Sequence, residues 1–294
     1  MNIKNLKNTS SASEILDFFD NDERGLHHTN YYHYTKLETI KHIFQKKSIF
    51  LTQLKRDAAG DITGNDKQDV YPENVFTLCF ATGTSESLPL WYLYSGIDGK
   101  GARIGIKKAT FAKWINNLSF TLAEWKNKTL VPESLVFLNN CQYHVKLRDI
   151  LYLGKDTQNK NTYRAKYGDC VKNGISTEIY SQIKEEYGDF IKGLIWFYEK
   201  ESRLQVTVTD RSLIDPEKDY VLMTSIESIQ NELSVRLAPK FENACDVTLF
   251  DNADSRNPPL HLELSDYAGM INMRLKKRLC EECENFSQRK DGKS

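Results

Sequence analysis

The sequence predicts an α+β fold in which strands outnumber helices. Short β-prone segments recur along the chain, and they do not alternate regularly with helical segments as they would in a doubly wound α/β sheet. With 40% hydrophobic and 11% aromatic residues, the 294-residue chain can also bury a sizeable core. We find no internal repeat and no Pro/Gly-rich linker, which favours a single domain with insertions over two separate domains.

The expected organisation has a main domain over residues 30–264. A helical extension over residues 1–29 precedes it, and an insertion lies at about 107–190. A C-terminal helix and a polar tail occupy residues 265–294.

Two helices are predicted from capping-box spacing near the N-terminus. Ser11 and Glu14 precede an apolar run, which indicates a short helix in the extension. Thr35 and Glu38 have the same spacing, so Thr35 is the expected N-cap of a second helix. Residues 30–34, between the two, are β-prone and predict a strand.

The remaining elements follow from hydrophobic periodicity and turn residues. Strands are predicted at 48–54, 75–80, 102–106, 135–145, 194–209, 219–224, 233–237 and 246–250. Helices are predicted at 87–95, broadly over 161–190, and from Ser265 onward. The polar segment 55–69 has no periodicity and predicts a long loop.

Composition excludes some classes of protein. Lys plus Arg and Asp plus Glu both number 40, so bulk positive charge does not drive binding to nucleic acid. No apolar run approaches the roughly 20 residues of a membrane span. The six cysteines are scattered, which is typical of reduced thiols in the cytoplasm.

Common cofactor and metal motifs are incomplete. Gly99 and Gly101 resemble a dinucleotide fingerprint only in part, and they enter a strand rather than a helix, so a tight turn is the expected structure. Cys280 and Cys283 form a single CxxC, whereas a structural zinc site needs four ligands. We therefore expect no metal.

The most informative segment is residues 194–208. If this segment is a strand with period two, Glu199, Glu201 and Arg203 share one face and the aliphatic residues share the other. Two carboxylates and a guanidinium cost little free energy on a solvated face, and in a cleft the same groups can form a functional site. Both alternatives stay open at this point.

Two aromatic segments are further candidates. His33 lies among tyrosines just before the second predicted helix, where it can be a structural donor or a ligand-binding residue. The segment 90–95 has aromatic residues at helical spacing, which suits either a core or a flat stacking surface for a planar ring.

Taken in order, these segments carry a resemblance to a known family. The chain has HYT at 33–35, CF at 79–80, LPLWYLY at 88–94, GARIGI at 101–106, WFYEKESR at 196–203 and LAPK at 237–240. This order is similar to a widespread bacterial domain family of unknown function, which in turn resembles ADP-ribosyltransferases of the His-Tyr-Glu type. The resemblance covers about residues 31–250 and implies a single-domain, ADP-ribosyltransferase-like split β-sheet core with flanking helices and helical insertions.

The resemblance implies a role in NAD binding for the first two segments. His33 would hydrogen-bond the adenosine-side ribose, with Tyr34 and Thr35 beside it. Tyr94 would pack on the nicotinamide ring, and Trp91 would support it.

The last segment would carry the chemistry. Glu201 would accept from the 2′-hydroxyl of the nicotinamide ribose, and Glu199 would assist or orient the target. Arg203 would fix the carboxylates or touch a phosphate. The pattern does not distinguish Glu199 from Glu201, and we take Glu201 as the catalytic residue. The sequence departs from the family at Lys67, where many members have a proline after Asn-Asp.

The function expected from this resemblance is NAD-dependent ADP-ribosyl transfer by a bacterial toxin or anti-phage effector. Its target would be a nucleic acid or a protein, and an antitoxin is a plausible partner. Residues 140–173 have seven basic and three acidic side chains with interleaved tyrosines, which suits either single-stranded RNA or DNA or an ordinary solvated surface.

Two other functions remain as alternatives. One is a non-catalytic binding module on the same fold. The other is a metal-dependent nuclease that uses Glu199, Glu201 and Asp66.

Overall fold

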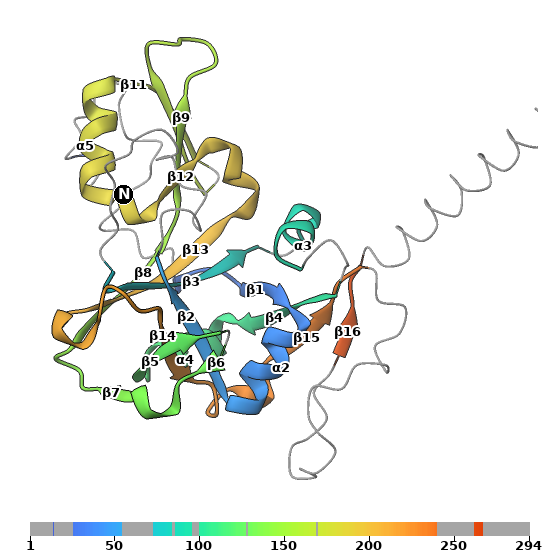
Figure 1. Cartoon of the computed structure of the whole chain (residues 1–294). Helices are drawn as coiled ribbons and strands as arrows, with labels where there is room; N and C mark the ends of the chain where they lie inside the picture. The colour runs from blue at the N-terminus through green and yellow to red at the C-terminus, as the bar shows by residue number, and fades with distance from the viewer. Residues whose placement is uncertain are drawn as a thin grey trace, which may run out of the picture. The chain divides into compact units, whose positions relative to one another are not determined.

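The computed structural model describes residues 14, 26–54, 73–83, 86–95, 100–127, 129–168, 170–239 and 262–266. Within these residues the protein is a mixed α+β structure with more strands than helices, as predicted (Figure 1). The chain divides into two compact units. The first unit comprises residues 1–33, 46–84 and 106–232, and the second comprises residues 34–45, 85–105 and 233–294.

The main sheet of the first unit is organised around β3 (Val75–Thr82). One edge of β3 pairs with β13 (Glu201–Val208) in an antiparallel ladder from Glu201 opposite Ala81 onward. The other edge is shared by two strands. β2 (Ser48–Gln53) pairs with the beginning of β3, and β1 (Asn30–Lys36) pairs with its end. The sheet is therefore split along this edge of β3.

Further antiparallel strands extend this sheet. The additional strands are β8 (Tyr143–Asp149) on β13, β14 (Tyr220–Ser225) on β2, β5 (Phe120–Lys126) on β14, and both β6 (Thr129–Leu130) and β7 (Val136–Leu138) on β5.

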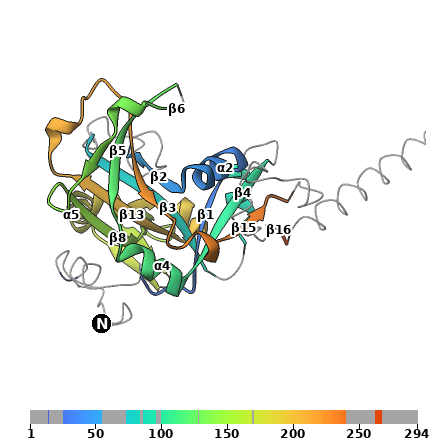
Figure 2. The ribbon, with the colours of Figure 1, turned by 90° about the horizontal axis from the view of Figure 1, so that it is seen from below.

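Helix α4 (Lys108–Ile115) covers part of the main sheet (Figure 2). Its Phe111 ring stacks on Tyr31 of β1 at a centroid distance of 3.6 Å and meets Phe80 of β3 edge-on. Trp114, one helical turn later, is also buried and donates to the carbonyl of Ser225. These large apolar contacts stabilise the helix, which has no side-chain cap at its N-terminus.

A second, four-stranded sheet also belongs to the first unit. Its order is β11 (Cys170–Ile175), β10 (Tyr163–Tyr167), β9 (Leu151–Lys155) and β12 (Ile191–Gly193). Only the β9–β12 pair is parallel. Helix α5 (Thr177–Tyr187) lies beside this sheet in Figure 1, and its Tyr180 ring stacks on Tyr163 of β10 at 3.8 Å. We call these four strands the small sheet.

The described part of the second unit contains α2 (Leu37–Lys46), α3 (Leu88–Ser95), the end of β1 and three further strands. β4 (Gly101–Lys107), whose last two residues belong to the first unit, pairs antiparallel with β15 (Ser234–Leu237). β15 in turn pairs in parallel with β16 (Leu262–Leu264). Within the described residues, the first unit also contains the short 3₁₀ helices η3 (Pro132–Ser134), η4 (Gly188–Phe190), η5 (Leu194–Glu199), η6 (Arg211–Leu213) and η7 (Gln230–Glu232).

Three sequence-based expectations are wrong in the first unit. Residues 163–167 and 170–175 are not helical but form the antiparallel β10–β11 pair, and Gly168, directly after β10, has φ 55°. The strand predicted at 135–145 is interrupted after Leu138, where the Asn139 side chain accepts from the backbone of Cys141 and ends β7. Residues 194–199 form η5 rather than the beginning of a strand.

The strands predicted at 30–34, 48–54, 75–80, 102–106, 219–224 and 233–237 and the helix predicted at 87–95 agree with the structure to within a few residues. Helix α4 and the strands β5, β6, β9, β12 and β16 were not predicted. Thr35 lies inside β1, and α2 begins at Leu37, so the predicted N-cap position is one residue early. The predicted N-terminal helix (except residue 14), the loop 55–69, the strand 246–250 and the helix after Ser265 fall almost entirely outside the described residues. Along the part of the chain that is described, no helix is long and apolar enough to cross a membrane.

Candidate functional site

A left-handed turn at Lys200 brings the two candidate glutamates together. Lys200 has φ 45° and ψ 52°, ends η5, and separates Glu199 from the first residue of β13, Glu201. The turn is fixed to β3, because the Lys200 carbonyl accepts hydrogen bonds from the backbone N–H and the hydroxyl of Thr82. Glu199 and Glu201 therefore converge through a turn and not through the strand alternation predicted from the sequence.

Four charged side chains form one buried cluster, which we call the quartet: Lys192, Glu199, Glu201 and Arg203. The Lys192 ammonium lies 2.7 Å from Glu199 Oε2 and 2.6 Å from Glu201 Oε2. Arg203 Nε donates to Glu201 Oε1 at 2.9 Å. No side chain of the quartet is more than 5% exposed. The face predicted to be either solvated or in a cleft is thus buried and charge-balanced.

The electrostatics of the quartet keep Glu201 ionised. Burial alone would raise its pKa, but the Arg203 guanidinium, the Lys192 ammonium and hydrogen bonds outweigh burial and lower the pKa to about 2. The converse holds for Lys192: burial lowers its pKa, yet the neighbouring carboxylates raise it above its ordinary value. A carboxylate in this setting is charged at every physiological pH.

Two uncharged neighbours complete the surroundings of Glu201. Its backbone N–H donates to the Tyr152 hydroxyl at 2.8 Å, and the Cys79 thiol donates to its carboxylate. Burial, reinforced by the charge of Glu201, raises the pKa of Cys79 to about 12, so this thiol is protonated and is a poor nucleophile.

His33 lies in β1 of the same unit. Its Nδ1 is 3.1 Å from the carbonyl oxygen of Cys79. A carbonyl only accepts, so Nδ1 carries the proton, and burial lowers the pKa of the ring so that it stays neutral. Nε2 is then the nitrogen with a lone pair, which suits it to accept a hydrogen bond from a hydroxyl.

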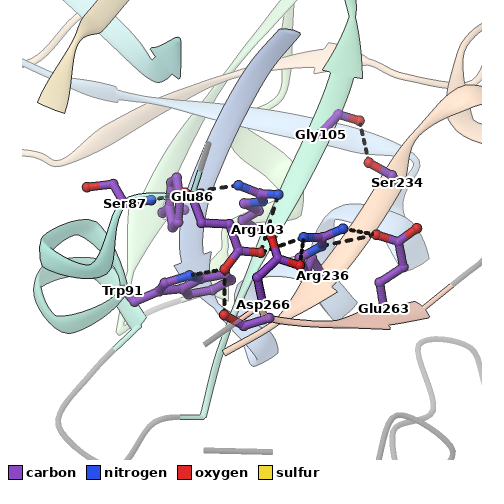
Figure 3. Close-up of polar contacts among 11 residues, drawn as sticks. Glu86, Ser87, Trp91, Arg103, Gly105, Ser234, Arg236, Glu263 and Asp266 are labelled. Carbon is purple, nitrogen blue, oxygen red and sulfur yellow. Dashed lines mark hydrogen bonds and ion pairs between the residues drawn. The ribbon is translucent and has the colours of Figure 1, made fainter. Parts of the chain in front are cut away.

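The second unit contains a polar network centred on Glu86, drawn in Figure 3. The Glu86 side chain is only 2% exposed and accepts from the Trp91 indole at 3.2 Å and from the Ser265 hydroxyl. Its other oxygen accepts from Arg236 at 2.8 Å and lies 3.6 Å from Arg103. Burial raises the pKa of Glu86, but these donors outweigh burial and lower it.

The network extends from Glu86 in two directions. Arg103 donates to the Tyr34 hydroxyl at 3.1 Å, and the same hydroxyl accepts from the backbone of Ser87. On the other side, Arg236 pairs with Glu263 and Asp266, as Figure 3 shows. The short segment 262–266 is therefore held to β15 by ion pairs as well as by strand pairing.

The aromatic candidates differ in accessibility. The Trp91 ring is 2% exposed and meets the Tyr34 ring edge-to-face at 4.8 Å, so both belong to the packed interior of the second unit. Thr35 is partly exposed in β1. Tyr94 is 43% exposed on α3, beside the still more exposed Tyr92.

The structure brings together only part of the predicted site within each unit. Glu199, Glu201 and Arg203 form the quartet in the first unit, which also contains His33. Tyr34 and Trp91 contact each other in the second unit, which also contains Thr35 and Tyr94.

Sequence reasoning missed Lys192 and Glu86. Lys192 follows an apolar residue in a three-residue strand, and Glu86 stands just before α3, where an acidic residue is ordinary at a helix N-terminus. Neither position has a local pattern that identifies a buried charge. Their ion-pair partners become visible only when the chain is folded.

Several side chains of the basic and aromatic region at 140–173 make contacts with other residues of the protein. The cations of Arg148, Lys155 and Lys166 lie over the rings of Tyr187, Tyr163 and Phe197, respectively. Tyr152 and Tyr167 are buried in the core of the small sheet. These ring faces already have partners, which favours the ordinary structural interpretation over base stacking.

No group of three or more His, Cys, Asp or Glu side chains that could hold a metal ion is found among the described residues. Glu199 and Glu201 instead share an ammonium, while Asp66, Cys280 and Cys283 lie outside the described residues.

Comparisons of the chain with protein-family models, with curated proteins and with solved structures find no match.

Proposed function

We propose that this chain is an NAD-dependent ADP-ribosyltransferase with Glu201 as its catalytic carboxylate. The observation that carries the proposal is the quartet: an ionised carboxylate at the beginning of β13, held at both oxygens and shielded from water. The split edge of β3, shared by β1 and β2, is consistent with the split-sheet core that the family resemblance implies.

The chemistry needs such a carboxylate. Cleavage of the bond between the ribose C1′ and the nicotinamide nitrogen leaves an oxocarbenium-like centre, and the bonding electrons leave with neutral nicotinamide. A preorganised negative charge stabilises that centre, as in glycoside cleavage. The acceptor's nucleophile then bonds to C1′ and loses its proton.

The other site residues have roles that suit their surroundings. A neutral His33 with Nε2 as the acceptor matches a hydrogen bond from a ribose hydroxyl. Tyr94, one of two exposed tyrosines of α3, is proposed to pack on nicotinamide, whereas the buried Trp91 supports the helix through Glu86. Tyr34 and Thr35 are proposed to assist NAD binding. Arg203 holds Glu201 rather than a phosphate.

The biological setting is proposed from the resemblance alone. The chain would be a toxin or anti-phage effector of the bacterial cytoplasm, and an antitoxin would neutralise it. The internal cation–π contacts in the region 140–173 make a protein acceptor as reasonable as RNA or DNA.

The test is label transfer from NAD that is labelled in its adenylate half. Purified protein is incubated with total RNA, DNA or lysate protein as the acceptor, and the wild type is compared with Glu201→Gln. Glu185→Gln, an exposed carboxylate on α5, is the matched control. We expect transfer by the wild type and the control and none by Glu201→Gln.

A second pair of variants tests the aromatic role. Tyr94→Ala should raise the KM for NAD, while Tyr92→Ala on the same helix should leave it unchanged. Tight NAD binding without nicotinamide release would instead support the non-catalytic module. Phosphodiester cleavage that is lost in chelator would support the nuclease.

A further inference from the structure

The small sheet reaches the quartet through two neighbouring residues. Lys192 of β12 is paired in register with Tyr152 of β9, so their side chains lie on the same face. The Lys192 ammonium contacts Glu199 and Glu201, and the Tyr152 hydroxyl accepts from the Glu201 backbone. One strand pair thus contacts both the charge and the backbone of the proposed catalytic residue.

The charge balance of the quartet depends on Lys192. Glu199 and Glu201 both accept from the same nitrogen, so two buried carboxylates lie within hydrogen-bond reach of one atom. Two carboxylates this close in a buried site do not both stay ionised unless a cation lies between them. Arg203 Nε pairs with Glu201 Oε1, and the Arg203 guanidinium also donates to the Asp189 carbonyl.

We propose that Lys192 is a positioning residue, held in place by the small sheet, that keeps Glu199 and Glu201 together in their charged forms. The catalytic part of this inference rests on the proposed function, since Lys192 acts through Glu201. The electrostatic part does not, because it concerns the protonation of two carboxylates in the folded chain.

Other titratable and charged groups also face the quartet. They are Cys79 of β3, Tyr152 of β9, Asp189 of η4 and Tyr198 of η5. Burial raises the pKa of both tyrosines, and burial with Glu201 raises that of Cys79. All three are protonated at neutral pH. Asp189 uses its carbonyl toward Arg203 and its carboxylate toward Gln205.

The first test measures nicotinamide release against pH for the wild type, Lys192→Met and Lys192→Arg. Lys155→Met, which removes an exposed cation of the same sheet, is the matched control. Lys192→Met should move the acid limb of the rate from about pH 2 to about pH 5 or higher, and so lower the rate at pH 5 at least about twofold relative to the rate at pH 7. Lys192→Arg should restore most of the wild-type profile. An equal loss at every pH, or no change, would overturn the proposal.

The second test does not need NAD turnover. In the wild type, the pKa of Glu201 is below its unfolded value, so stability falls as the pH drops from about 4.5 toward 2. In Lys192→Met, one carboxylate has a raised pKa in the folded state, so stability should fall as the pH rises from about 4.5 toward neutrality. Urea unfolding across this range gives the sign of the slope.

Nicotinamide release and the slope of stability against pH test the proposed function and the role of Lys192 separately. A wild type that releases no nicotinamide defeats the proposed function, and the slope of stability alone then judges the role of Lys192. If Lys192→Met does not fold, Lys192→Met with Glu199→Gln restores charge balance. This double variant should fold and regain the wild-type slope; failure to do so would contradict the inference.

Discussion

The coupling between Arg203 and Glu201 gives a quantitative test of the quartet. The Arg203 side chain is 1% exposed, and its Nε lies 2.9 Å from Glu201 Oε1. Removing one partner of a buried ion pair costs about 3–5 kcal/mol, because the other charge is left without compensation. We therefore expect Arg203→Met to lower the free energy of unfolding by about 3–5 kcal/mol.

The size of the coupling follows from the pKa of Glu201. A fall from 4.5 to about 2 corresponds to about 3 kcal/mol of stabilisation of the charged form, shared mainly between Arg203 and Lys192. We expect Glu201→Gln to cost about 3 kcal/mol. The double variant leaves the balanced pair of Lys192 and Glu199, so its cost should be about 2 kcal/mol less than the sum of the single costs.

The assay is urea unfolding at pH 7 of the wild type, both single variants and the double variant. The free energies are compared in a double-mutant cycle. Glu185→Gln with Arg203→Met provides a control cycle between residues of different elements. Costs in the Glu201 cycle that add to within about 0.5 kcal/mol would refute the reasoning, because independent sites behave in that way.

Three further predictions concern the acid titration of Glu201, the packing of the small sheet and the network around Glu86. Acid titration should destabilise the wild type between pH 4.5 and about 2, where the unfolded chain binds more protons, and Glu201→Gln should flatten this limb in urea unfolding. Gly154→Ala places a Cβ 2.9 Å from Leu194 Cβ and should cost about 1–3 kcal/mol, while Gly188→Ala, with nothing within 4 Å, should cost far less in thermal unfolding. Glu86→Gln removes the buried carboxylate that Arg103 and Arg236 share and should lower the free energy of unfolding by about 3 kcal/mol. Glu263 is half-exposed, so Glu263→Gln should lower it by about 1 kcal/mol. Equal losses of stability in the two variants would contradict this account.

Local sequence patterns predicted several of the strands, although not β9 and β12, which contact the quartet. β2, β3, β14 and β15 each have apolar residues that alternate or cluster over a strand length, and turn residues bound them. Helix α3 was predicted from the helical spacing of its aromatic residues, and Pro89 lies in its first turn, where proline is tolerated. Such signals lie within a few residues, so a single sequence contains them.

The errors arise where distant parts of the chain decide the structure. Tyr163, Ala165 and Tyr167 alternate toward a core that α5 and β9 complete, whereas the sequence pattern predicted a helix through them. At 194–199, an aromatic run that suits a strand forms η5, because Lys200 adopts a left-handed turn fixed to Thr82. Strand propensity does not encode that turn.

The candidate site follows the same division. The sequence indicated Glu199, Glu201 and Arg203, and the structure joins them. The sequence did not indicate Lys192, which links the two glutamates, because no local pattern reveals which cation a buried carboxylate will contact. Whether these charged side chains are buried could not be predicted, since period-two alternation gives the face of a strand but not what covers that face.

The central claim is that Glu201 takes part in the reaction rather than serving only the fold. The most direct measurement is the rate of nicotinamide release from NAD by the wild type, Glu201→Gln and Glu199→Gln, each verified as folded by circular dichroism. We predict a loss of at least about 100-fold in Glu201→Gln and a smaller loss in Glu199→Gln. A folded Glu201→Gln that releases nicotinamide within about twofold of the wild-type rate would contradict the claim.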